Sequence, residues 1–192
     1  MNEIEKTIKI NGIKTGAFLG VCLLVLSIAS FYFITAMAKS PVAFVAIPII
    51  FSFLLPIALV LLFSFSQRKK IGGYWSFKQA TTGIFIMFFI AYVIQISGRD
   101  LVFGKFIEPD MVTKIEASTI TATTMVMQSG KSSQQQIDAK VAELKTDFDN
   151  QRNVTIAGII QGIAVSIIFA FVLALIFGAL MKRDPPVYET VN

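Results

Sequence analysis

The chain contains no histidine and only one cysteine, Cys22, among its 192 residues. Without histidine, the Ser-His-Asp and Cys-His catalytic arrangements and histidine-ligated zinc sites are excluded. A single cysteine cannot form an internal disulfide. Because Cys22 lies in an apolar stretch, we expect it to act as a small packing residue.

Charged residues are also missing from four long stretches, residues 17–38, 41–66, 79–98 and 153–181. A helix of about 20 apolar residues crosses a bilayer, and a charge at its centre costs roughly 2.5 to 3.5 kcal/mol. The chain is therefore predicted to be an all-α polytopic membrane protein. We expect one membrane domain, 1–192, with transmembrane helices at about 17–38, 42–66, 79–98 and 154–181. Residues 36–38 resemble a signal-peptidase site, but the apolar run before them is longer than signal peptides use, which favours a retained helix.

The lack of charged residues inside the spans also excludes several membrane mechanisms. Proton or sodium coupling and intramembrane aspartyl proteolysis need buried ionisable groups, and these stretches have none. Their main polar side chains are Gln95 and Gln161, which we interpret as a possible pair bonding across helices, a contact typically worth about 0.6 kcal/mol. No catalytic residue, cofactor site or metal site is predicted. Four charged residues after the third span, Arg99, Asp100, Glu108 and Asp110, are too few to supply the six or more oxygens that a hard cation requires.

The basic residues predict the orientation. Nine of them flank the first, second and fourth spans on one side: Lys6, Lys9, Lys14, Arg68, Lys69, Lys70, Lys78, Lys182 and Arg183. Only Lys39 lies in the other short loop. The positive-inside rule then places both termini in the cytoplasm. This distribution accounts for the net charge of +5 without a nucleic-acid partner.

Residues 99–152 are predicted to be an extracytoplasmic helical insertion. Apolar or neutral positions from Val112 to Val126 fit a first helix that ends near Gly130. Ser132 or Ser133, followed three residues later by Gln135 or Gln136, caps a second helix. The spacing of the apolar positions alternates between three and four, which is typical of two helices that share a seam. The hairpin could pack on itself, on the membrane or on another protein. Residues 184–192 are expected to form a flexible cytoplasmic tail.

Two patterns predict how the spans pack. The second span contains Pro48 and Pro56, each of which removes a backbone donor and kinks a helix or opens a local defect. Small residues recur every four positions in the fourth span and near the start of the first, which allows helix backbones to approach closely. The expected helix-packing residues are Gly158, Gly162, Ser166, Ala170, Ala174, Gly178, Gly12, Gly16 and Gly20.

A motif of eight residues precedes the third span: Gly72, Gly73, Tyr74, Trp75, Ser76, Phe77, Lys78 and Gln79. Ser76 and Gln79 form a capping box, and Tyr74 with Trp75 suits the headgroup level of a membrane. We interpret the motif as a helix start at the interface, with recognition of a lipid headgroup or a partner as the alternative.

This motif, the Glu108-Pro109-Asp110 step and the basic Met181-Lys182-Arg183 ending together resemble the bacterial family called domain of unknown function 4199. The resemblance covers nearly the whole chain, although relatives tend to have a different polar residue at the position of Glu108. It implies a protein of the Gram-negative inner membrane and transfers no catalytic residue.

The sequence therefore favours a non-enzymatic inner-membrane protein that contacts membrane lipids and a protein partner or a second copy of itself, as an accessory subunit of a membrane complex. The alternative is a small-solute carrier or channel with a path near Pro48, Pro56, Gln95 and Gln161.

Overall fold

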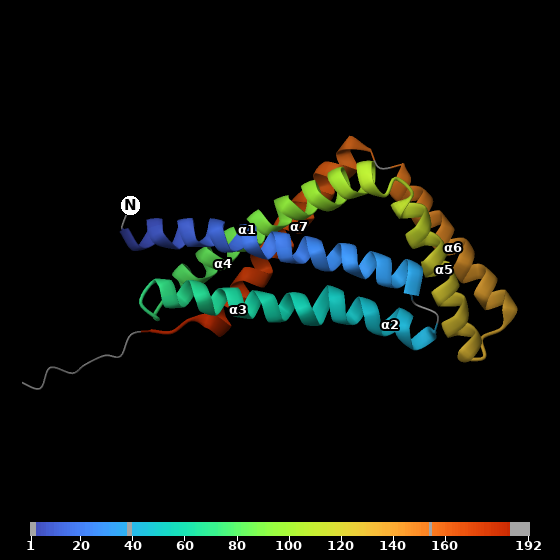
Figure 1. The fold of residues 1–192 in the computed structure, drawn as a ribbon, viewed down its shortest axis with the longest axis horizontal. Helices are drawn as coiled ribbons and strands as arrows, with labels where there is room; N and C mark the ends of the chain where they lie inside the picture. The colour runs from blue at the N-terminus through green and yellow to red at the C-terminus, as the bar shows by residue number, and fades with distance from the viewer. Residues whose placement is uncertain (1–2, 38–39, 154, 185–192) are drawn as a thin grey trace, which may run out of the picture. The chain divides into compact units, whose positions relative to one another are not determined.

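The computed structural model describes residues 3–37, 40–153 and 155–184. These residues form helices and no β-strand, which confirms the predicted all-α class (Figure 1). The seven α-helices are α1 (Glu3–Tyr32), α2 (Pro41–Ile49), α3 (Leu55–Lys70), α4 (Phe77–Gln95), α5 (Met111–Ser129), α6 (Gln134–Arg152) and α7 (Ile156–Met181). Three π-helical segments lie among them: η1 (Phe33–Met37), η2 (Ile50–Leu54) and η3 (Ile96–Ile107).

Four helical stretches are long and apolar enough to cross a membrane by length and composition: Glu3–Ala36, Pro41–Lys70, Phe77–Ile107 and Ile156–Met181. They match the four predicted spans in number and order. The first three extend beyond the charge-free stretches, since α1 begins at Glu3, α3 ends at Lys70 and η3 continues the third helix to Ile107. Of the predicted tail, only Asp184 lies within the described residues.

The chain divides into two compact units, which are described separately. The first unit comprises Met1–Leu23, Ile57–Gln95 and Ile163–Asn192, and the second comprises Leu24–Pro56 and Ile96–Gly162. The first unit therefore contains the beginning of α1, nearly all of α3, the whole of α4 and most of α7. Its buried core includes Leu19, Trp75, Ile84, Met87 and Ala174.

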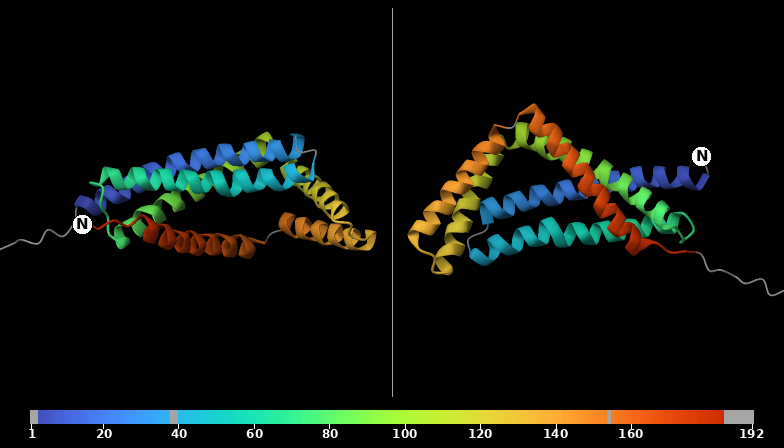
Figure 2. Two further views of the ribbon diagram at one scale, coloured as in Figure 1. Left: turned by 90° about the horizontal axis from the view of Figure 1, so that it is seen from below. Right: turned by 180° about the vertical axis from the view of Figure 1, so that it is seen from behind.

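The second unit contains the helices of the predicted insertion. α5 and α6 lie side by side in all three ribbon views (Figures 1 and 2), and α5 also contacts α2 and η1. The turn between α5 and α6 places Lys131 at a positive φ of 58°. Ser133 and Gln136 then form a reciprocal capping box, which settles the choice of cap at the start of α6.

The prolines of the second span flank a local change of helix type. Pro48 lies inside α2, and η2 ends two residues before Pro56. The backbone N–H of Leu55 donates to the carbonyl of Ile50, five residues earlier. Proline has no N–H to donate and crowds the carbonyl four residues back, so a π-helical turn there is the kind of local defect expected.

Candidate functional site: the core and cavity of the first unit

The beginning of α1 packs against α4 through its three glycines. A Cβ atom built on Gly16 would lie 2.7 Å from the carbonyl oxygen of Met87, and one on Gly12 would lie 3.0 Å from that of Gly83. A Cβ on Gly20 would lie 3.1 Å from the Cα of Ala91. No larger side chain fits these positions unless the helices separate. The three glycines therefore set how closely α1 approaches α4.

The motif before α4 connects to the end of α7. Trp75 is only 1% exposed, and its indole N–H donates to the carbonyl of Met181 at 2.7 Å. Trp75 and Arg183 also exchange two backbone hydrogen bonds of 3.0 Å. The Trp75 ring is therefore enclosed by protein. Tyr74 remains partly exposed, with the Arg183 guanidinium 5.5 Å from its ring centroid.

The glycines and the cap of this motif have separate roles. Gly72 and Gly73 adopt φ values of 96° and 85°, which side chains rarely tolerate. The backbone N–H of Ser76 then donates to the Gln79 side chain at 2.9 Å, and the Gln79 N–H donates to Ser76 Oγ at 3.4 Å. These bonds confirm the predicted capping box. The motif turns the chain and starts α4 while holding the end of α7.

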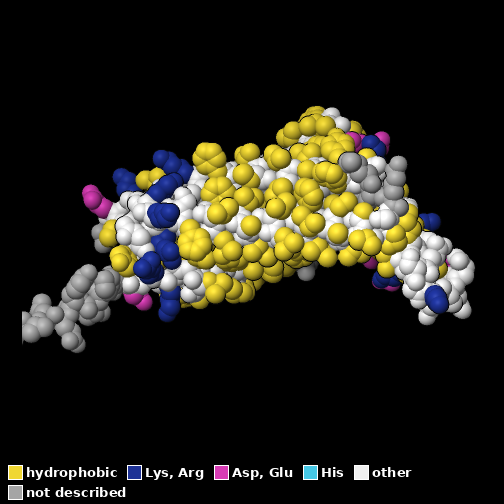
Figure 3. All heavy atoms as spheres, turned by 60° about the horizontal axis from the view of Figure 1, so that its bottom comes forward, with side chains coloured by type: hydrophobic (Ala, Val, Ile, Leu, Met, Phe, Trp, Pro, Cys, Tyr) yellow, Lys and Arg dark blue, Asp and Glu magenta, His cyan; other side chains and the backbone are white. Residues whose placement is uncertain are grey.

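The basic residues of the first unit gather beside its apolar surface, as Figure 3 shows. Arg68 also serves the end of α7, because its guanidinium donates to the Met181 carbonyl at 3.2 Å. A cavity of about 230 Å³ in the same unit is lined by Lys9, Lys78 and Gln79 together with Glu5, Ile8 and Thr82.

The small residues of α7 differ in how closely they pack. Ala174 and Gly178 are buried, and a Cβ on Gly178 would overlap the Thr81 side chain and lie 3.1 Å from the Thr81 backbone nitrogen. Ser166 and Ala170 are half-buried. At Gly162, by contrast, no described atom lies within 4 Å of an added Cβ, and this glycine is exposed. Gly162 therefore makes no close contact with the described residues, and its part in helix packing stays a prediction.

A mainly apolar cavity of about 510 Å³ lies among α1, α3, α4 and α7. It is lined by Leu19, Leu23, Val60, Phe88, Ala91, Tyr92, Gln95, Val165, Ser166, Phe169, Ala170 and Leu173. The half-buried Ser166 and Ala170 of the predicted stripe thus form part of a cavity wall. Small residues that were expected to bring helices together leave space at this point.

Gln95 provides an amide on this wall. Its Oε1 atom is buried and has no hydrogen-bond partner among the described residues. Gln161, predicted as its companion, is exposed on α7 and belongs to the second unit. A buried amide oxygen without a donor is unfavourable, since it has lost water and gained nothing in exchange.

Other buried polar groups lie in the core of the first unit. The Nε2 atom of Gln67 donates to the sulfur of Met87 at 3.2 Å, while Gln67 Oε1, Ser64 Oγ and Thr81 Oγ1 have no partner among the described residues. Sequence reasoning missed Gln67 and Ser64 because they appear as ordinary polar positions near a basic turn. One signal was present: Ser64 and Gln67 lie four and seven residues after Val60, so all three lie on one face of α3.

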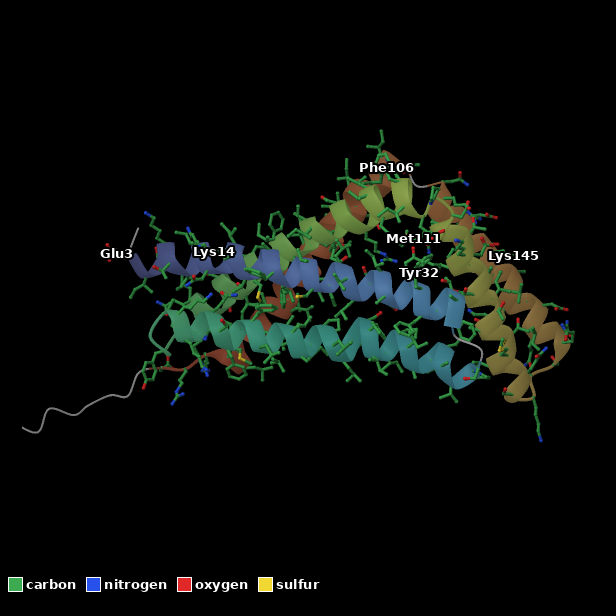
Figure 4. All side chains as sticks on the ribbon, viewed as in Figure 1. Glu3, Lys14, Tyr32, Phe106, Met111 and Lys145 are labelled. Atoms are coloured by element: carbon green, nitrogen blue, oxygen red, sulfur yellow. The ribbon has the colours of Figure 1, made fainter. Side chains whose placement is uncertain are left out.

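In the second unit, Glu108 joins the end of α1 to the start of α5. It accepts hydrogen bonds from the ammonium of Lys114 and, at 3.5 Å, from the hydroxyl of Tyr32. Figure 4 labels Tyr32 together with Met111, the first residue of α5. The rings of Phe31, Tyr32 and Phe103 pack edge to face with centroids 5.0 to 5.9 Å apart. The hydrogen bond to Glu108 raises the pKa of Lys114 above its ordinary 10.5.

A second ion pair connects α5 with α6. The Arg152 guanidinium lies 2.5 Å from Glu116 and 3.0 Å from Asp149, and the hydrogen bond to Glu116 raises the pKa of Arg152 above its ordinary value. Within the described residues, no group of three or more Cys, Asp or Glu side chains could hold a metal ion. The Glu116 carboxylate thus takes part in a bond between α5 and α6.

Residues 14–183 match the family described as Protein of unknown function (DUF4199). The chain belongs to this family. The match includes the α1 glycines Gly16 and Gly20, the motif before α4 and Arg183 at the end of the Trp75 contact. No curated protein and no solved structure matches the chain.

Proposed function

We propose that this member of the DUF4199 family is a non-enzymatic integral protein of the bacterial inner membrane. It acts through contacts with lipids or with another protein, as an accessory subunit of a membrane complex. One observation carries the proposal: the buried polar side chains among the described residues, Thr15, Ser30, Ser64, Gln67 and Thr81, are hydroxyls and amides and include no ionisable group. Such groups support hydrogen bonding and packing, whereas proton transfer and ion coupling in membranes use carboxylates, lysines or histidines.

Purification of the full chain in mild detergent, followed by mass spectrometry of the associated proteins and lipids, tests the proposal. We expect at least one protein or lipid to be retained in a fixed ratio across several detergents. A chain that retains no molecule under every gentle condition would contradict the proposed role.

A solute carrier is the second candidate, favoured by the cavity beside Gln95 and by the π-helical turn between Pro48 and Pro56. A carrier must open its site to water on alternate sides of the membrane. A cysteine introduced as Gln95→Cys, in a Cys22→Ala chain, would then react with a charged thiol reagent. If that cysteine remains unreactive from both sides in proteoliposomes, the carrier function fails.

Cytoplasmic termini and an extracytoplasmic α5–α6 pair are also part of this proposal, supported by the nine basic residues on one side. Ser132→Cys and Thr190→Cys, each in a Cys22→Ala chain, report the two sides. An impermeant thiol reagent should label the cysteine at position 132 in intact spheroplasts. Labelling at position 190 alone would reverse the orientation.

A further inference from the structure

The cavity of the first unit is open to an apolar surface. Its volume of about 510 Å³ falls in the range of about 300 to 1,000 Å³ that is usual for small-molecule sites. Two of its lining residues on α7, Val165 and Phe169, are 58% and 62% exposed. Because α7 is long and apolar enough to cross a membrane, these exposed side chains would face lipid in a bilayer. An apolar chain can therefore enter the cavity sideways from the bilayer without crossing water.

The Gln95 amide is a polar group on the wall of this mainly apolar cavity. The buried Oε1 atom has no hydrogen-bond partner among the described residues, so a donor group on a molecule in the cavity would satisfy it. The terminal torsion of glutamine has a broad energy minimum, which allows the amide to turn either its oxygen or its nitrogen toward the cavity. A hydroxyl group both donates and accepts, so it can pair with the amide in either orientation. Tyr92 and Ser166 add two hydroxyl-bearing side chains to the same wall.

The position of Gln95 along α4 indicates which part of a lipid would carry that hydroxyl group, its head or its chain. Gln95 lies about 27 Å along the helix axis from Phe77 at a rise of about 1.5 Å per residue, and the first charged residues after it are Arg99 and Asp100. This distance is close to the thickness of about 30 Å of a hydrocarbon core. The amide thus lies near the level at which lipid chains meet their headgroups. Phe88 lines the cavity about 10 Å deeper along the same helix.

We propose that this cavity binds a long-chain lipid with a free hydroxyl group at its head, such as a monoacylglycerol. The hydroxyl pairs with the Gln95 amide, and the chain lies against Leu19, Phe88 and Ala170. The inference rests on the proposed function, because it names the class of lipid that the protein contacts.

Native mass spectrometry of the full chain with two matched probes tests the hydroxyl. Monoolein and methyl oleate carry the same acyl chain, but only monoolein has free hydroxyl groups. Monoolein should bind in a one-to-one ratio and about three- to tenfold more tightly, which is the range for one hydrogen bond. Gln95→Leu should remove that difference while leaving methyl oleate binding unchanged.

Two alanines of α7 test the place of binding. Ala170 lines the cavity, whereas Ala164 is exposed on the same helix and does not line it. Ala170→Leu should lower the affinity for both probes at least tenfold by filling the cavity, and Ala164→Leu should leave both affinities unchanged. Circular dichroism and melting of all three variants establish that they are folded, and a variant that fails this check is replaced by Ala170→Val or Gln95→Met.

Equal binding of the two probes, or full binding by the folded Ala170 variant, would overturn the inference. If partner proteins are recovered but lipid binding fails in either of these two ways, the lipid site is overturned and the proposed accessory role stands. A chain that binds monoolein as described but recovers no partner protein keeps the inference and the contact with lipid, and it overturns only the role as a subunit of a complex.

Discussion

Two stripes of small residues, one in α1 and one in α7, behave differently. In α1, Gly12, Gly16 and Gly20 each lie so close to α4 that a Cβ atom would meet backbone or Cβ atoms within about 3 Å. In α7, such contact is found at Gly178, while the region of Ser166 and Ala170 lines a cavity and Gly162 is exposed. The shorter stripe is therefore in contact along its whole length and the longer stripe is not.

The partner helix explains the difference. α4 presents Gly83, Met87 and Ala91 at four-residue intervals, and these match the three glycines of α1 in both spacing and closeness. On α7, the described contact of this kind is the one between Thr81 and Gly178. Close packing of helices in a membrane needs a small residue and also a second helix that presents its backbone to it. A stripe of small residues on one helix is therefore not sufficient for close packing without a suitable second helix.

The largest effect is expected from a bulky side chain in the α1 stripe. Gly16→Leu forces a side chain against the backbone of Met87, so the helices must separate and lose many dispersion contacts. We expect a loss of about 3 kcal/mol in the free energy of unfolding, the upper part of the range for overpacking. Thermal or denaturant melting in detergent measures it. Gly162→Leu is the matched control and should melt no lower than the parent, because the added side chain meets no described atom. Comparable losses in the two variants would remove the distinction between the stripes.

The packed end of α7 should respond next most strongly. Gly178→Ala brings a methyl group against the Thr81 side chain and backbone, for an expected loss of about 1 to 2 kcal/mol. Thr81→Ala in the same chain should recover part of this loss, because it removes the nearest contact. If the double variant is no more stable than Gly178→Ala, the Thr81 side chain is not the cause.

The contact between Trp75 and α7 predicts a smaller effect. Trp75→Phe keeps an aromatic ring but removes the N–H that donates to the Met181 carbonyl, so a loss of about 1 kcal/mol is expected from the hydrogen bond, with a further contribution from lost packing. Tyr74→Phe should be nearly silent, since Tyr74 is partly exposed and contacts Arg183 through its ring. An equal melting temperature for the parent and the Trp75 variant would show that the bond does not stabilise α7.

The smallest effect concerns the second unit, where ion pairs replace close backbone packing. The pKa of Lys114 is raised by its hydrogen bond to Glu108, so this contact stabilises the fold fully below about pH 10.5. The contribution is lost as the pH rises through the higher pKa of the folded state. Lys114→Gln should therefore melt slightly below the parent at pH 8, and the difference should disappear at alkaline pH. A difference that persists unchanged above pH 11 would exclude this linkage.

Much of the fold was predictable because its causes are local in the sequence. The four charge-free stretches identified the spans, and Ser76 with Gln79 identified the start of α4. The cavity, the burial of Trp75 and the packing state of Gly162 were not predictable. Each depends on which helix lies opposite, and a residue pattern on a single helix does not contain that information. Gln95 was identified as a polar side chain within a span, but its unpaired oxygen and its place on a cavity wall depend on three other helices.

The most direct test of the difference between the stripes is a comparison of alanine at Gly16 and Gly162 by melting of the purified proteins. At Gly16 the added methyl meets the Met87 carbonyl, so stability should fall. At Gly162 the methyl meets no described atom, and alanine favours the helix by about 0.5 to 1 kcal/mol over glycine, so stability should rise. Opposite signs are the predicted result. A gain at Gly16, or a loss at Gly162, would contradict the assignment of α1 as the closely packed helix.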